Sequence, residues 1–180
     1  MALFGFFGRQ RKNRALIEGI YAVIVERSRS AAFYRDLGVP DSVDGRFEML
    51  TLYMTLVTRQ LRALPTPGPD MAQDLVDVTF AQFDSALREM GVGDVSMPKR
   101  MKAMAGAYLG RASAYDEALR SGDHEALLTA LKRNLYGRAP IPAGAAEKIA
   151  DDVLKSVAAL ESGSIDDYHA AKLPLPPFSL

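Results

Sequence analysis

The sequence predicts an all-α protein, organised as a single-domain bundle of about six helices. Apolar residues recur at intervals of three and four along most of the 180 residues, and the alternation typical of strands is missing. Glycine and proline interrupt this pattern at short intervals, as turns between helices do. The apolar fraction of 48% and the charged fraction of 24% are typical of globular proteins, so the chain can bury one core.

The first predicted helix spans about residues 13–30, and the second spans about residues 47–64. Both place isoleucine, leucine, valine and methionine on one broad side. The segment 36–45 between them is rich in glycine, proline and aspartate and is predicted to be a turn-rich loop. The prolines and glycine of segment 65–69 end the second helix.

The third predicted helix follows Asp70, a candidate N-cap with Gln73 placed as in a capping box. Its apolar stripe continues to Met90. Gly91 and Gly93 then end the helix, because glycine readily adopts the left-handed conformation that follows a C-cap.

The fourth predicted helix is capped by Ser96 and continues to about Arg120, with proline tolerated in its first turn. Segment 122–123 is a glycine followed by an aspartate, which stops one helix and starts the next. The fifth helix has a leucine stripe over 127–135, and the sixth spans about 143–162.

Three regions follow from these boundaries. We expect residues 1–12 to be a flexible apolar and basic segment, and residues 13–163 to form the helical domain. Residues 164–180 end in a proline-rich stretch and are expected to be extended.

The composition argues against catalysis and against a bound metal or cofactor. There is no cysteine, and the two histidines, His124 and His169, belong to no ligand motif. The acidic pairs 151–152 and 166–167 lack the further carboxylates of magnesium motifs, so a helix start or a solvated face explains them better. No nucleophile elbow or phosphate-cradling glycine loop is present. We therefore expect no enzyme activity, no metal and no cofactor.

The amino-terminal end combines aromatic and basic residues. A signal peptide places its basic residues before the apolar run, whereas here they follow it, so we expect a cytoplasmic protein. The apolar run is too short for stable anchoring, so any contact with the anionic inner membrane is expected to be reversible and peripheral. The predicted membrane-contact residues are Phe4, Phe6, Phe7, Arg9, Arg11 and Lys12.

Segment 90–111 contains four of the eight methionines, interleaved with basic residues. Methionine side chains adapt to irregular apolar surfaces, although the same spacing fits burial in a core. Core packing does not explain the lysines and arginines, which favours a protein-binding role for them. The predicted binding set is Met97, Lys99, Arg100, Met101, Lys102, Met104, Tyr108 and Arg111.

Several short motifs, in order and spacing, resemble the ubiquinol–cytochrome c chaperone family over about residues 15–160. They are Ala32-Phe-Tyr34, Gly38-Val-Pro-Asp41, Asp44-Gly-Arg-Phe-Glu-Met49, Leu87-Arg-Glu-Met-Gly-Val-Gly-Asp94, Pro98-Lys-Arg-Met-Lys102 and Tyr108-Leu-Gly-Arg-Ala112. The resemblance implies a non-enzymatic assembly chaperone that binds cytochrome b or an early intermediate of the cytochrome bc1 complex (complex III) of the respiratory chain. Because no transit peptide is seen, we expect a bacterial homologue.

Mitochondrial members of this family also work beside the ribosome with a small partner subunit, and the matched residues encode neither role. Two alternatives stay open. The basic amino-terminal third is compatible with a ribosome- or RNA-associated helical module, although no RNA-binding motif is present. A helical haem-binding protein is the weaker alternative, because the histidines are so few.

Overall fold

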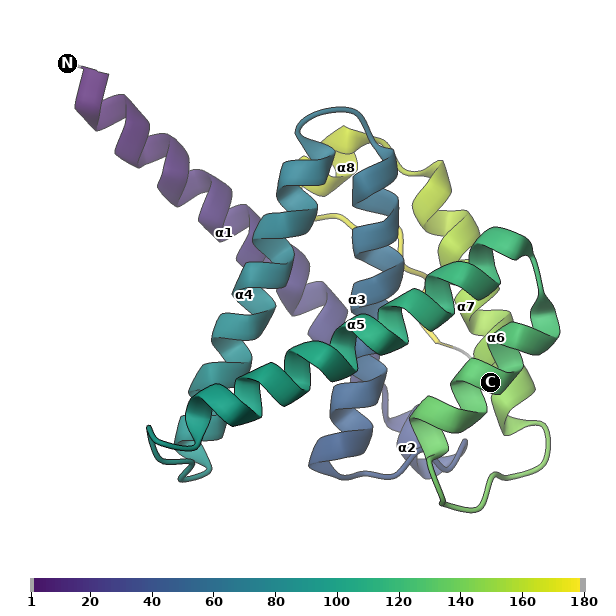
Figure 1. Ribbon diagram of the computed structural model, residues 1–180. Helices are drawn as coiled ribbons and strands as arrows, with labels where there is room; N and C mark the ends of the chain where they lie inside the picture. Colours follow the sequence, from purple (N-terminus) through teal and green to yellow (C-terminus); the bar gives the residue numbers. More distant parts are fainter. Residues whose placement is uncertain (1, 179–180) are drawn as a thin grey trace.

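The computed structural model confirms the predicted fold class, since residues 2–178 contain helices and no strand (Figure 1). It describes the backbone of these residues and the side chains of residues 14–168 and 170–178. The helices pack around one continuous hydrophobic core. In chain order the elements are α1 (Ala2–Ser28), α2 (Ala31–Arg35), α3 (Val43–Ala63), α4 (Gly68–Glu89), α5 (Met97–Ser121), α6 (His124–Leu131), the π-helical η1 (Lys132–Tyr136), α7 (Ala145–Ser162) and α8 (Ile165–His169).

The six predicted helices correspond to α1 and to α3 through α7, the fifth being divided between α6 and η1. The sequence does not predict α2 and α8, because a helix of five residues is too short to show a hydrophobic period. The predicted extended tail therefore begins with α8. Residues 172–178 have no regular structure, and Leu173, Leu175 and Phe178 pack against the core.

Capping chemistry sets several of the helix boundaries. The Ser42 hydroxyl accepts a hydrogen bond from the Gly45 amide at 3.1 Å, so α3 begins at Val43 instead of near residue 47. Gly122 ends α5 in the left-handed conformation with φ 68°, and the Asp123 carboxylate accepts from the Ala126 amide at 2.9 Å. The predicted stop and restart at 122–123 is confirmed.

Two amino-terminal boundaries differ from the prediction. Helix α4 begins at Gly68, so Asp70 lies inside its first turn and is not the N-cap. Proline is tolerated in a first helical turn, because the first amide groups have no partner there, and Pro69 therefore does not delay the start. Helix α1 begins at Ala2 and not near residue 13, and its amino-terminal half extends beyond the bundle (Figure 1).

Helix α3 is the central element, and it contacts α1, α4, α5 and α7 (Figure 1). Its threonines are buried along with its leucines and methionines. The hydroxyl groups of Thr55 and Thr58 donate to the carbonyl oxygens of Thr51 and Met54, at 2.8 and 2.7 Å. Because these bonds close within the helix, residues 51–58 of α3 can be buried on every side while the hydroxyls of Thr55 and Thr58 keep acceptors.

A buried ionic cluster joins three helices. Arg27 of α1 donates to the Asp152 carboxylate of α7 at 2.5 Å, and the Tyr53 hydroxyl of α3 donates to the other carboxylate oxygen, also at 2.5 Å. The Arg27 guanidinium lies 5.0–5.5 Å from the ring centroids of Tyr53, Phe33 and Phe178, so aromatic faces cover it. The expectation that the pair 151–152 marks a helix start or a solvated face is wrong for Asp152, which is 6% exposed.

We expect Asp152→Asn to lower the free energy of unfolding by about 3 kcal/mol, because the change leaves the buried Arg27 cation without its counter-charge. Urea unfolding followed by circular dichroism measures this. The control is Asp151→Asn, which removes an exposed carboxylate from the neighbouring position of the same helix. Equal stability of the two variants would contradict the assigned role of the pair.

Candidate protein-binding surface

Helix α5, which carries the predicted binding set, lies across α3 and α4 (Figure 1). A chain of aromatic contacts anchors its inner face. Tyr108 of α5 meets Phe80 of α4 edge to face, with 5.6 Å between ring centroids. Phe83 of α4 in turn lies 5.6 Å from Phe80 and 5.5 Å from Phe47 of α3. Such pairs favour one arrangement of the three helices over others.

Arg111 points toward this inner face, and its side chain is 28% exposed. Its guanidinium donates to the Glu48 carboxylate of α3 and lies 5.7 Å from the centre of the Phe47 ring. Glu48 is 6% exposed. Burial raises the pKa of Glu48 above its usual value, and the Arg111 charge limits that rise. Arg111 therefore holds α5 against α3, and its charge already has a partner.

The methionines of the predicted binding set also face inward. Met97 and Tyr108 are 4% and 3% exposed, and Met101 and Met104 are half-buried. Their spacing of three and four residues places them on the side of α5 that packs on the bundle. The methionine stripe has two interpretations, burial in the core and an adaptable binding surface. Core packing describes Met97, whereas Met101 and Met104 lie at the border of the packed face.

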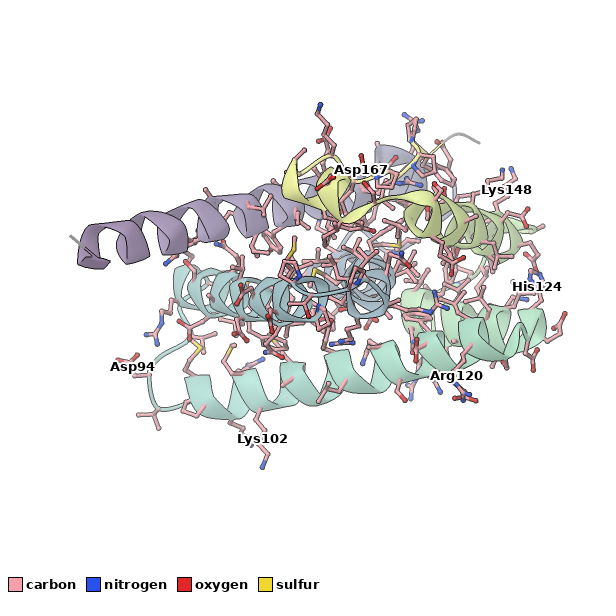
Figure 2. The ribbon with its side chains drawn as sticks, turned by 90° about the horizontal axis from the view of Figure 1, so that it is seen from above. Asp94, Lys102, Arg120, His124, Lys148 and Asp167 are labelled. Carbon is pink, nitrogen blue, oxygen red and sulfur yellow. The ribbon has the colours of Figure 1, made fainter. Side chains whose placement is uncertain are left out.

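The remaining three members of the set are exposed cations. Lys99, Arg100 and Lys102 all project from the first turns of α5, and Figure 2 shows Lys102 pointing away from the bundle. None of the three forms an ion pair with any side chain that the structure describes. Helical geometry places Lys99 and Lys102 on the outward side, while Arg100 lies toward one edge.

The outward side of α5 is lined mainly by small and apolar residues. Apart from the backbone of α5 itself, no described atom lies within 4 Å of a Cβ built on Gly106 or on Gly110, so both glycines face open space. Leu109, between them, is 64% exposed. We call this surface the outer face of α5, which comprises Lys99, Lys102, Ala103, Gly106, Leu109, Gly110 and Ser113.

Sequence reasoning misses three exposed apolar residues beside the cations. Val95 is 99% exposed in the turn before α5, Met90 is 54% exposed at the end of α4, and Leu109 lies on the outer face. The exposure of Leu109 can be predicted from its position in the helix. It directly follows Tyr108 and therefore lies off the stripe formed by Met97, Met101, Met104 and Tyr108. No comparable signal exists for Val95, since a turn has no period.

Two other predicted features are placed as follows. The side chains of the predicted membrane-contact residues lie outside the described part of the structure, and their contact with a membrane stays a prediction. These residues are Phe4, Phe6, Phe7, Arg9, Arg11 and Lys12. Over residues 2–178, the helices lack the combination of length and apolarity needed to cross a bilayer. His124 is exposed at the start of α6, and the described side chains form no cluster of three histidines or carboxylates able to hold a metal ion.

Comparisons with known proteins agree with the motifs and the fold. The family model described as ubiquinol-cytochrome C chaperone matches residues 35–175. The crystal structure of the Cbp3 homolog from Brucella abortus is similar to this chain with a TM-score of 0.84 and 34% sequence identity, over 96% of this chain and 95% of that one. Comparison with curated proteins gave no match. The family and fold matches confirm the resemblance predicted from the sequence.

We expect Arg111→Met to destabilise the protein in a pH-dependent way. Without its cation, buried Glu48 has a still higher pKa in the folded state, so the folded protein binds more protons than the unfolded chain. Stability is then lost as the pH rises from the ordinary glutamate pKa through the raised folded value. The deficit relative to the wild type should reach about 2–3 kcal/mol at neutral pH and shrink in acid.

Urea unfolding at several pH values measures that deficit. The control is Glu48→Gln combined with Arg111→Met, which removes the buried charge and should flatten the pH dependence. A deficit for Arg111→Met that is independent of pH would contradict the assigned pairing.

We expect Gly106→Ala to raise the free energy of unfolding by about 0.5–1 kcal/mol, because alanine is the better helix former and nothing obstructs its Cβ. The contrasting variant is Gly45→Ala, whose Cβ would lie 1.9 Å from the Pro40 carbonyl oxygen and which should destabilise the fold. Thermal and urea unfolding measure both. A destabilised Gly106→Ala would show that another part of the chain covers the outer face.

Proposed function

Because this chain belongs to the ubiquinol-cytochrome c chaperone family, we propose that it is a non-enzymatic assembly chaperone for the cytochrome bc1 complex, and that it binds cytochrome b or an early intermediate of the complex through the outer face of α5. The observation that carries the proposal is the combination found on that face. Unpaired cations, glycines facing open space and an exposed leucine lie together on one helix that is otherwise firmly packed.

The cations supply steering and orientation. Arg111 is held against α3 by the buried Glu48, and turning toward a client would leave that carboxylate buried without its counter-charge. Lys99, Arg100 and Lys102 carry no such cost. They can attract acidic groups on the loops of a client, and exposed charges of this kind increase the rate of association more than the final affinity. Modest affinity suits a chaperone, which has to release its client.

The small residues supply close contact. Without side chains at Gly106 and Gly110, the backbone of another helix can approach α5 closely, as small residues permit between membrane helices. Leu109, Val95 and Met90 add exposed apolar surface of adaptable shape. In this proposal the inner face of α5, including Tyr108 and Arg111, supports the site and does not touch the client.

The amino-terminal half of α1 is the part of the proposed chaperone that would contact a membrane. This half extends away from the bundle (Figure 1), and its sequence carries the predicted membrane-contact residues. We propose reversible contact with the cytoplasmic face of the inner membrane, where a membrane-embedded client emerges. One short aromatic and basic segment gives weak binding on its own, so the client contributes the rest of the affinity.

Reversing charge on the outer face should impair assembly. We expect Lys99→Glu combined with Lys102→Glu to weaken client binding by roughly 10- to 100-fold and to reduce assembled bc1 complex in cells lacking the wild-type gene. Native gel electrophoresis of membranes measures the complex. Photocrosslinkers at positions 99 and 102 should capture cytochrome b.

The matched control is Lys148→Glu combined with Lys155→Glu, which reverses two exposed lysines on α7. Figure 2 shows Lys148 and Lys102 on opposite sides of the bundle, so the control changes the net charge equally at a distant surface. Normal assembly in the α5 variant, or equal loss in both variants, would rule out the outer face as the client site. Crosslinks from positions 99 and 102 to another bc1 component would support the chaperone role but would show that the client is not cytochrome b.

A further inference from the structure

A second cationic site lies at the junction of α1, α2 and α3. Here the chain leaves the end of α1, forms the short α2, and returns through the loop into α3, and these segments line a solvent-open cavity of about 390 Å³. The cavity is lined by Arg29, Ala31, Tyr34, Arg35, Asp41 and Arg46.

The lining carries an excess of positive charge. It contains three guanidinium groups and one carboxylate. Arg46 donates to Asp41 at 2.7 Å, and Arg35 pairs with the adjacent Asp36 at 2.8 and 2.7 Å. Arg29 forms no ion pair with the side chains that the structure describes. Its charge still acts on the cavity: burial raises the pKa of the Tyr34 hydroxyl, and the charges of Arg46 and, to a smaller extent, Arg29 oppose that rise.

The existing ion pairs leave room for a ligand. Both pairs are exposed, with Arg35 and Arg46 side chains 74% and 54% accessible, and exposed pairs contribute little net free energy. A guanidinium has five N–H donors, and Asp41 and Asp36 use only some of them. Arg29, Arg35 and Arg46 can therefore donate to a further acceptor without losing a strong interaction.

The backbone that positions these arginines is firmly held. The Tyr34 hydroxyl donates to the Ser28 carbonyl oxygen at 2.7 Å, which fixes α2 against the end of α1. The Pro40 carbonyl lies so close to Gly45 that any Cβ there would clash, which fixes the loop against the first turn of α3. The three arginines thus come from segments that do not need to rearrange to face the same cavity.

We propose that this cavity binds a phosphate group. A tetrahedral oxyanion with several acceptor oxygens can receive hydrogen bonds from three guanidinium groups at once, and arginine is well suited to bind phosphate. The lining has two more positive than negative charges, which matches a phosphate dianion more closely than a single carboxylate. This site is separate from α5, so the proposal does not depend on the chaperone role.

A free phosphate-bearing solute and a lipid headgroup share this chemistry. The cavity lies at the carboxyl end of α1, about 40 Å of helix from the amino terminus at 1.5 Å per residue. The predicted membrane-contact segment is at the other end, so binding of a headgroup here would be a second and separate membrane contact. Experiment can therefore distinguish the two sources.

The test is a titration of the full chain with inorganic phosphate at constant ionic strength, followed by amide chemical shifts. We expect saturable shifts concentrated in residues 29–46. Arg29→Gln, which removes the arginine without an ion pair, should weaken binding roughly tenfold or more. The control is Arg62→Gln, another exposed arginine, located in the last turn of α3 while the cavity lies at its first.

Vesicles of phosphatidylcholine with and without phosphatidylglycerol identify the source. Binding to the anionic vesicles that Arg29→Gln loses would identify a lipid headgroup, and phosphate binding without vesicle binding would identify a free solute. Phosphate shifts that do not saturate, or equal effects of Arg29→Gln and Arg62→Gln, would overturn the proposal. It would also fail if a glutamate-rich peptide bound the cavity more tightly than phosphate.

Discussion

The ion pair between Arg27 and Asp152, with Tyr53 as a third member, is the interaction on which the arrangement of this bundle depends. It connects α1, α3 and α7 through residues separated by up to 125 positions in the chain. A buried pair of charges tolerates little displacement, because each charge loses its water on burial and keeps only its partner. The cluster therefore fixes α3 as the central helix, and α4 and α5 then pack on the sides of α3 that remain.

Helix α5 shows how one helix divides structural and binding roles between its two sides. On the inner side, Glu48 neutralises Arg111, and the aromatic contacts of Tyr108 fix the helix in place. On the outer side, Lys99 and Lys102 have no counter-charge among the described side chains. Gly106 makes the helix less stable than alanine would, although no described neighbour leaves too little space for a Cβ. Rigidity on one side allows the other to present a preformed surface, which reduces the entropy lost when a partner binds.

Closely spaced cations mark two surfaces of the described residues, although the formal net charge of the chain is zero. One is the outer face of α5, and the other is the arginine-lined cavity at the junction of α1, α2 and α3. Other arginines are paired with carboxylates: Arg59 with Asp116 and Glu161 of other helices, and Arg88 with residues of its own helix and of the turn that follows. Charge distribution, more than net charge, thus determines which surfaces of this bundle are suited to acidic or phosphate-bearing partners.

The sequence by itself determined the all-α class, most helix boundaries and the family, because periodicity, caps and short motifs are local. It placed Ser96, Gly122 and Asp123 at helix ends, and it separated the exposed lysines of α5 from the methionine stripe. Only the tertiary structure decided that Asp152 is buried against Arg27, that Arg111 turns toward Glu48, and that Arg29 and Arg46 line one cavity. The physical reason is that the partner of a buried charge lies far away in the chain, where no local pattern records it.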